Sequence, residues 1–250
     1  MKEVLLVTGS SGIAAATARL WAADNPVFLV GINEEQCRAL AAELGEAGFA
    51  VADVRDELAV RNAVAACLER FGRIDALFNV AGISARSAGD GPLHECKPAA
   101  WDLVMGVNAK GSFLMCREVL GVWMDNAHAG VILNCGSVLA RHPQRGYFAT
   151  VGYAASKGAI EAMSIAAAAY YAPRGIRVNV IAPGLVRTAM SARAQANPRI
   201  AEYMAHKQPL TKGLLSAEEV AKTACFLLRS DSGPITGQIV TVDGGWGVSE

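Results

Sequence analysis

Short apolar runs alternate along the chain with longer segments in which apolar residues recur every three or four positions. The runs are rich in Val, Ile, Leu and Phe, which is typical of strands that are buried on both faces of a parallel sheet. We expect strands at residues 4–8 (VLLVT), 27–31 (VFLVG), 49–52 (FAVA), 75–80 (DALFNV), 130–137 (GVILNCGS), 176–182 (IRVNVIA) and 238–243 (QIVTVD).

The intervening segments have the spacing of amphipathic helices, as in residues 34–47 (EEQCRALAAELGEA) and 57–72 (ELAVRNAVAACLERFG). Ser216 and Glu219 have the spacing of a capping box, which predicts the start of the last helix. Because strand and helix alternate throughout, we expect an α/β fold in which a seven-stranded parallel sheet carries helices on both faces.

The chain has 250 residues without a linker or a low-complexity tract, so we expect a single domain over residues 1–250. Residues 184–215 lack strand character and contain Pro198, Pro209 and Gly213. Long segments of this kind in compact domains are often functional, and we interpret this one as a movable substrate lid. A static helical excursion is the alternative.

Lys and Arg together number 23, as do Asp and Glu, so net charge favours neither nucleic acid nor an anionic membrane as a partner. The six cysteines form no C-x-x-C pair, which favours reduced, packed thiols. The run VLLV is too short for a signal peptide, and no stretch approaches the roughly 20 apolar residues of a membrane span. We therefore expect a cytoplasmic protein that acts on a small molecule.

The stretch TGSSGIA, residues 8–14, lies between the first strand and a helix, where a pyrophosphate binds in dinucleotide-binding folds. Gly9 permits a tight turn and Gly12 permits close approach of the backbone to phosphate. Asp53 stands at the end of the third strand, where its carboxylate is suited to accept a hydrogen bond from the amino group of adenine. The small residues of NVAG (79–82) end the fourth and let a dinucleotide cross the sheet.

In YAASK, Tyr153 and Lys157 lie at i and i+4 and share one face of a helix. A phenol is ordinarily protonated at neutral pH, so a phenol that acts as a base needs a cation nearby. Tyr147 is a rival phenol, but no lysine lies four residues beyond it. The pair therefore predicts proton transfer at Tyr153.

These motifs, together with VNAKGSF, NCGS, RVNVIAPG, PGLVRT and VDGG, resemble the short-chain dehydrogenase/reductase family over nearly the whole chain. The resemblance implies a doubly wound Rossmann fold, an NAD(P) cofactor and hydride transfer between a substrate carbon and the nicotinamide. It implies that Tyr153 exchanges the hydroxyl proton and that Lys157 assists it and binds the nicotinamide ribose. Ser137 would bind the carbonyl oxygen, and Asn108 would hold a water that links Lys157 to solvent.

The cofactor-binding residues that this resemblance implies come from the ends of several strands. They are Gly9, Ser11, Gly12, Ile13, Asn33, Asp53, Val54, Asn79, Ala81, Gly82, Tyr153, Lys157, Pro183, Gly184, Val186 and Thr188. The family's loop reads T-G-x-x-x-G-x-G, whereas here it is one residue shorter and Ala14 replaces the last glycine. The methyl group of Ala14 is expected to widen the contact between helix and strand.

The end of the second strand reads VGIN, with Gly31 where the family's NAD enzymes have Asp. No cation stands at Ser10, Ser11, Gly31 or Ile32 to pair with the 2'-phosphate of NADP, which favours NAD over NADP. Asn33 is a candidate ribose partner, and a helix N-cap ahead of EEQ is the alternative for it.

Residues 138–152 (VLARHPQRGYFATVG) are longer than the family's usual segment before the tyrosine and extend the rim of the substrate site. Arg141 and Arg145 are candidate ligands for an acidic substrate, and ordinary solvated surface charges are the alternative. His94, His128 and His206 have no paired spacing, so we expect no metal.

The segments 101–124 and 153–172 carry more apolar residues than one buried helix face needs. We therefore expect a homo-oligomer, a tetramer by family resemblance or a dimer.

The predicted function is NAD(P)-dependent interconversion of a secondary alcohol and a ketone. A 3-oxoacyl thioester reductase is an alternative, and a catalytically idle NAD(P)-binding sensor or scaffold is an alternative of another class.

Overall fold

The computed structural model describes residues 2–249 and contains one seven-stranded sheet. Its strands are β1 (Leu5–Thr8), β2 (Val27–Gly31), β3 (Ala47–Val51), β4 (Ala76–Asn79), β5 (Val131–Cys135), β6 (Arg177–Pro183) and β7 (Ile239–Val242). Their order is β3-β2-β1-β4-β5-β6-β7, and every neighbouring pair is parallel. The direction of winding reverses between β1 and β4, where doubly wound folds bind ligands.

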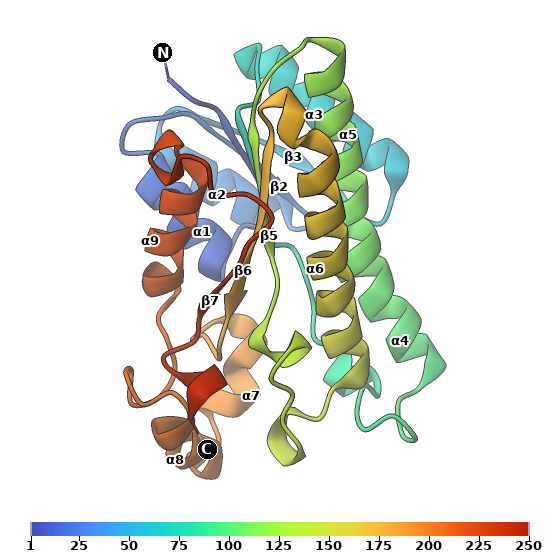
Figure 1. Ribbon diagram of the computed structural model, residues 1–250, viewed down its shortest axis with the longest axis vertical. Helices are drawn as coiled ribbons and strands as arrows, with labels where there is room; N and C mark the ends of the chain where they lie inside the picture. Colours follow the sequence, from blue (N-terminus) through green and yellow to red (C-terminus); the bar gives the residue numbers. More distant parts are fainter. Residues whose placement is uncertain (1, 250) are drawn as a thin grey trace.

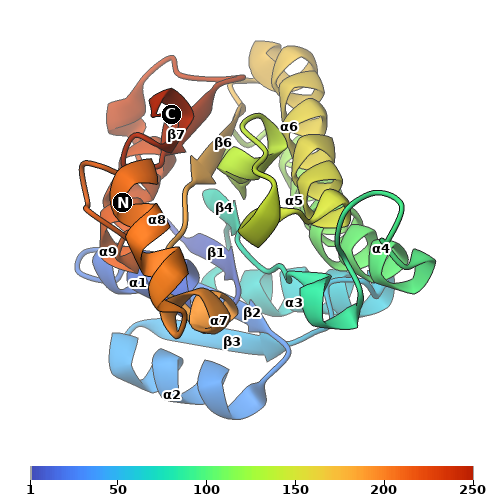
Figure 2. The same cartoon turned by 90° about the horizontal axis from the view of Figure 1, so that it is seen from below.

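Helices cover both faces of the sheet (Figures 1 and 2). One layer consists of α1 (Gly12–Trp21), α2 (Glu34–Leu44) and α9 (Ala217–Leu228), and the other of α3 (Glu57–Phe71), α5 (Gly111–Asp125) and α6 (Val151–Tyr171). The shorter helices α4 (Pro98–Val104), α7 (Ala192–Gln195) and α8 (Pro198–Lys207) follow strands β4 and β6. The predicted doubly wound parallel fold is confirmed.

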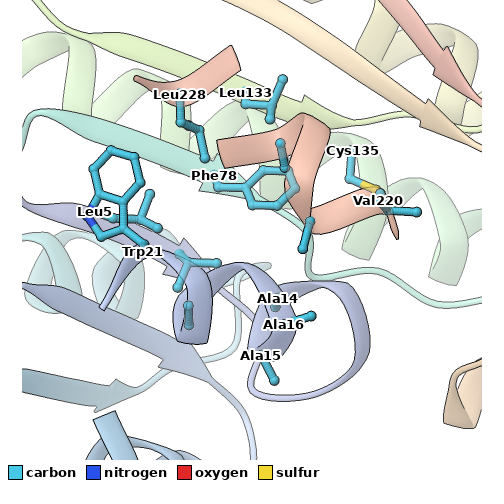
Figure 3. Close-up of a cluster of buried hydrophobic side chains, with 14 of the residues drawn as sticks. Leu5, Ala14, Ala15, Ala16, Trp21, Phe78, Leu133, Cys135, Val220 and Leu228 are labelled. Carbon is cyan, nitrogen blue, oxygen red and sulfur yellow. The ribbon is translucent and has the colours of Figure 1, made fainter. Parts of the chain in front are cut away.

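The two cores follow from the alternation of side chains along each strand. In β1, Leu5 and Val7 face the α1 and α9 layer, whereas Leu6 faces the α3 and α5 layer. Figure 3 shows the first core, where Trp21 of α1 lies with Leu5 and the alanines of α1 leave room for α9. Burial of such apolar side chains supplies most of the drive to fold.

Helix ends agree with the local sequence signals. Ser216 Oγ accepts a hydrogen bond from Glu219 N at 3.1 Å, and Glu219 Oε2 accepts one from Ser216 N at 2.7 Å, so the predicted capping box is confirmed. Helix α2 stops at Leu44, earlier than the expected 34–47, because Gly45 has a φ of +78° and breaks the helix. Strand β3 consequently begins at Ala47 rather than at residue 49.

Residues 184–215 form the helical excursion that was one of the two expectations for this segment. Helices α7 and α8 lie at the carboxyl end of the sheet, as Figure 2 shows. Ile200 and Met204 of α8 pack with Phe148 and Trp246 in a small apolar cluster. Gln208, fully buried, accepts from Leu185 N at 2.6 Å and donates to Gly213 O at 2.6 Å. The excursion is therefore packed on the domain, and its movement as a lid stays a prediction.

No helix within residues 2–249 combines the length and the apolar character needed to cross a bilayer. The six cysteines are unpaired: five are buried and Cys96 is half-buried. Burial raises the pKa of the Cys116 thiol to about 12, which agrees with the expected packed, reduced thiols.

Candidate functional site

A cavity of about 630 Å³ opens at the carboxyl end of the sheet, where β1, β4, β5 and β6 end. Its wall brings together twelve of the predicted cofactor residues and three of the predicted catalytic residues. They are Gly9, Ser11, Gly12, Ile13, Ala81, Gly82, Ser137, Tyr153, Lys157, Pro183, Gly184, Val186 and Thr188, with Tyr153 and Lys157 belonging to both sets.

The shortened glycine loop keeps the conformation that its glycines predict. Gly9 and Gly12 have φ values of +102° and +54°, a region that side chains rarely adopt. A Cβ at Gly9 would lie 3.2 Å from the Ala14 Cβ, and one at Gly12 would lie 2.9 Å from Thr188 Cγ2. Ala14 therefore fills space beside the turn, and the loop packs directly against residue 188.

The start of α1 has the features of a phosphate-binding site. Its N-cap Ser11 makes no side-chain capping hydrogen bond, and its first turn holds no acidic residue. The first amides of the helix therefore have no side-chain acceptor and carry the positive end of the helix dipole at the cavity wall. The residues present fit a bound pyrophosphate despite the deletion in the loop.

Thr8 joins this loop to the end of β4, a role that the sequence did not predict. Its Oγ1 accepts hydrogen bonds from Val80 N at 2.9 Å and Ala81 N at 3.0 Å. These bonds hold Ala81 and Gly82 beside Gly9. The only sequence signal is a hydroxyl residue immediately before the loop glycine.

Lys157 and Tyr153 project from the first turns of α6 toward the cavity. Lys157 Nζ lies 5.6 Å from the centroid of the Tyr153 ring and donates to Cys135 O at 2.7 Å. The lysine is only 4% exposed, although it lines the cavity. Ser137 lies two residues beyond the end of β5, and its Oγ accepts from Leu139 N at 3.2 Å, which leaves its hydroxyl hydrogen available to a ligand.

Asn108 lies behind the cavity wall, in a π-helical turn over Met105–Lys110. Its Oδ1 accepts from Ile83 N at 2.8 Å, and its Nδ2 donates to Ile83 O and Ser156 Oγ, both at 3.0 Å. Such single π turns are frequent at functional sites. A Cβ at Gly82 would lie 3.0 Å from Asn108 Oδ1 and 3.6 Å from Lys157 Nζ, so this glycine lets the two approach the wall.

Asp90 is a second residue near the cavity whose role the sequence did not predict. It is 4% exposed, and its carboxylate accepts from Gly152 N and Tyr153 N, both at 2.9 Å. These are amides of the first turn of α6, where an anion is stabilised by the helix dipole. Asp90 therefore anchors the backbone that carries the phenol.

Four predicted cofactor residues lie outside the cavity wall, namely Asn33, Asp53, Val54 and Asn79. Asn33 caps α2 and accepts from Gln36 N at 2.9 Å, which is the alternative stated for it. Asp53 forms an ion pair with Arg55, whose hydrogen bonds lower the pKa of the Asp53 carboxyl. The buried Asn79 donates to Asn134 Oδ1 at 2.8 Å and joins β4 to β5.

Gly31 ends β2 against a buried thiol. A Cβ at this residue would lie 2.7 Å from Cys37 Sγ and 3.5 Å from Ser10 Oγ. The carboxylate that the family's NAD enzymes have here would require Cys37 to move. This packing disfavours a side chain at residue 31 unless Cys37 shifts.

The two arginines predicted to bind an acidic substrate do not reach the cavity wall. Arg141 Nε pairs with Glu161 Oε2 at 2.8 Å, and Arg145 is exposed. Two other arginines, Arg86 after β4 and Arg193 in α7, do line the cavity, and the binding of an acidic substrate by Arg141 and Arg145 stays a prediction. Neither Arg86 nor Arg193 belongs to a recognisable motif, so the sequence carried no signal for them.

Comparison with known proteins finds relatives along the whole domain. A family model described as "Enoyl-(Acyl carrier protein) reductase" matches residues 7–247. The chain is 36% identical to a cis-4-hydroxycyclohexanecarboxylate dehydrogenase from Sinomonas cyclohexanicum, over 98% of this chain and 96% of the relative. It is 37% identical to a D-threitol dehydrogenase from Mycolicibacterium smegmatis, over 98% of this chain and 92% of that one.

Solved structures agree with these relatives. A short-chain type dehydrogenase/reductase from Mycobacterium ulcerans superposes with a TM-score of 0.91 at 27% identity, covering 99% of this chain and 90% of that one. A 3-ketoacyl-(acyl-carrier-protein) reductase from Brucella melitensis, complexed with NADH, has a TM-score of 0.87 at 30% identity, with 98% of both chains covered. An actinorhodin polyketide ketoreductase variant with NADPH also has a TM-score of 0.87 at 30% identity, covering 99% and 98%.

The matches extend over the residues of the glycine loop, the cavity and the strands that build it. The chain belongs to the short-chain dehydrogenase/reductase family and is an NAD(P)-dependent oxidoreductase that acts on CH–OH groups.

Proposed function

We propose that Tyr153 is the general acid and base with which this enzyme interconverts a secondary alcohol and a ketone. The observation that supports it is the meeting of Ser137, Tyr153 and Lys157 on one cavity wall beside the glycine loop. The nicotinamide, when bound, accepts or supplies the hydride. In the oxidation direction Tyr153 takes the hydroxyl proton of the alcohol, and in reduction it returns a proton to the carbonyl oxygen.

Lys157 and Ser137 assist this proton transfer. The buried Lys157, whose Nζ lies 5.6 Å from the phenol ring centroid, assists Tyr153 and binds the nicotinamide ribose. Ser137 donates its hydroxyl hydrogen to the substrate oxygen. Asn108 holds a water that connects Lys157 with solvent.

We propose NAD as the preferred cofactor. Gly31 offers no carboxylate to the ribose, but the residues that would meet a 2'-phosphate, Ser10, Ser11 and Ile32, are uncharged. Arg19, Arg38 and Arg55, the nearest arginines along the chain, are paired with Glu43, Glu34 and Asp53. Titration with NADH and with NADPH, followed by nicotinamide fluorescence, tests this preference.

Substitution of Tyr153→Phe tests the catalytic proposal. Removal of one hydroxyl leaves the ring packing in place, so we expect turnover of secondary alcohols to fall about 10²–10⁴-fold. NADH affinity, measured by fluorescence titration, should stay nearly unchanged. Tyr147→Phe is the matched control, because Tyr147 lines the same cavity but has no lysine four residues on. Undiminished turnover in Tyr153→Phe would refute the assignment.

We further propose a cytoplasmic homo-oligomer, a tetramer or a dimer. The six unpaired cysteines support a reducing compartment. Exposed apolar side chains on α4, α5 and α6 support subunit contacts there, namely Trp101, Phe113 and Ile165.

A 3-oxoacyl thioester reductase is the second candidate activity, and the 30% identical 3-ketoacyl reductase structure supports it.

A further inference from the structure

Arg86 and Arg193 come from distant parts of the chain and meet at the cavity wall beside Tyr153. Arg86 lies in a short helical turn after β4, and Arg193 lies in α7. Both side chains are tied to the insert that precedes α6. Arg86 Nη1 donates to Ala149 O at 3.4 Å and Arg193 Nη2 donates to Tyr147 O at 3.0 Å. Figure 2 shows α7 and this yellow-green insert at the same end of the sheet.

Within residues 2–249 no carboxylate lies within ion-pair distance of Arg86 or Arg193, and each has a single hydrogen bond to a carbonyl. The carboxylate of the nearby Asp90 is engaged by the amides of α6. Arg193 is exposed as a whole residue, and partial desolvation of its guanidinium, together with the charge of Arg86, lowers its pKa. An anion bound between two like charges would offset their repulsion.

Apolar side chains make up a large part of the remaining wall, among polar ones such as Ser87 and Ser191. Leu139, Phe148, Met190 and Trp246 line the cavity, and the Phe148 and Trp246 rings pack edge to face with centroids 5.2 Å apart. The apolar side chains can contact the apolar part of a ligand, while Tyr153 and the two arginines offer polar contacts on the same wall.

We propose that the substrate carries an anionic oxygen group, a carboxylate or a phosphate, which Arg86 and Arg193 bind while its alcohol or ketone carbon lies at Tyr153. The proposal rests on the proposed function for the location of the reacting carbon. An arginine presents a planar fork of donors that matches either oxyanion. The two arginines thus select substrates by charge, away from the reacting atoms.

The direct test is calorimetric titration of the protein with cyclohexanecarboxylate, cyclohexyl phosphate and the neutral cyclohexanecarboxamide. We expect at least one anion to bind about tenfold or more tightly than the amide. Arg86→Gln and Arg193→Gln should each weaken anion binding about tenfold and leave amide binding unchanged. Tighter binding of the carboxylate would identify a carboxylic acid substrate, and tighter binding of the phosphate would identify a phosphoryl or phosphopantetheine substrate.

Three controls separate this inference from the catalytic proposal. Arg145→Gln removes an exposed charge of the same insert that lies outside the wall, so anion affinity should not change. Tyr153→Phe should lose turnover but keep anion binding, because the calorimetric readout needs no reaction. NADH affinity should be unchanged in Arg86→Gln and in Arg193→Gln, because a loss of NADH affinity would assign these arginines to the cofactor phosphates. The inference is overturned if the wild-type protein binds the amide and the anions with equal affinity. It is also overturned if Arg86→Gln and Arg193→Gln both bind the anions as tightly as the wild type does. Either result counts against it even if the wild-type protein turns over alcohols.

Discussion

Single residues decide how much of the family's cofactor chemistry this chain retains. Ala14 occupies the place of a glycine, and its methyl group fits because Gly9 keeps a positive φ and has no Cβ to oppose it. Gly31 replaces a carboxylate, and the buried Cys37 thiol takes the space that the carboxylate would need. Each departure from the family pattern is accommodated by a neighbour that the sequence does not reveal.

The substitution Gly31→Asp tests the packing at the end of β2. With its Cβ placed 2.7 Å from Cys37 Sγ, the aspartate should lower the free energy of unfolding by about 1–3 kcal/mol in urea denaturation. Adding Cys37→Ala should recover part of that loss, which a double-mutant cycle measures. The double variant should also bind NADPH more weakly relative to NADH, because a carboxylate repels the 2'-phosphate. A cycle with no coupling would contradict this account.

Helix α6 shows how an element carries chemistry beyond its own motif. The YAASK spacing predicts that Tyr153 and Lys157 share a face, but not that the first turn of the helix is held by Asp90, 63 residues earlier than Tyr153. Lys157 is in turn held by a carbonyl at the end of β5. Tertiary contacts therefore decide where the phenol and the ammonium lie.

Asp90→Asn tests this anchor at the N-terminus of α6. It removes the charge that accepts two amide hydrogen bonds, so we expect a loss of about 1.5–3 kcal/mol in the free energy of unfolding. The kcat should fall more than the affinity for NADH, because the backbone of Tyr153 loses its fixed position while the glycine loop is unaffected. Asp102→Asn is the matched control on α4, where the carboxylate is exposed. Equal losses in the two variants would argue against a specific role for Asp90.

At the scale of the molecule, α5 and α6 leave apolar side chains uncovered. Phe113 and Ile165 are 47% and 46% exposed on these neighbouring helices (Figure 1). Burial between subunits would remove this surface from water, which is the driving force that we expect for assembly.

Light scattering on the purified protein tests this assembly. We expect a particle of two or four 26.1 kDa chains at micromolar concentration, and Phe113→Glu or Ile165→Glu should shift it toward the single chain. Leu58→Glu on α3 is the matched control, since Leu58 is 62% exposed but lies outside the predicted contact helices. A wild-type particle of 26.1 kDa would contradict the prediction.

The sequence by itself determined the elements that depend on local patterns. Apolar runs and helical periodicity predicted the seven strands and a parallel sheet with helices on both faces, because burial imposes those patterns on parallel α/β domains. Gly9, Gly12, Tyr153 and Lys157 were found for a similar reason: a turn needs glycine and a helix brings i and i+4 together, so these residues carry their geometry in their spacing.

Only the tertiary structure decided what depends on contacts between distant segments. It tied Arg141 to Glu161 and brought Arg86 and Arg193 to the cavity instead, and it assigned Asn33 and Asn79 to structural hydrogen bonds. The direction and partners of a long polar side chain are set by whichever neighbours the fold supplies. A substrate site built from a loop, an insert and a helical excursion therefore becomes visible only after the chain has folded.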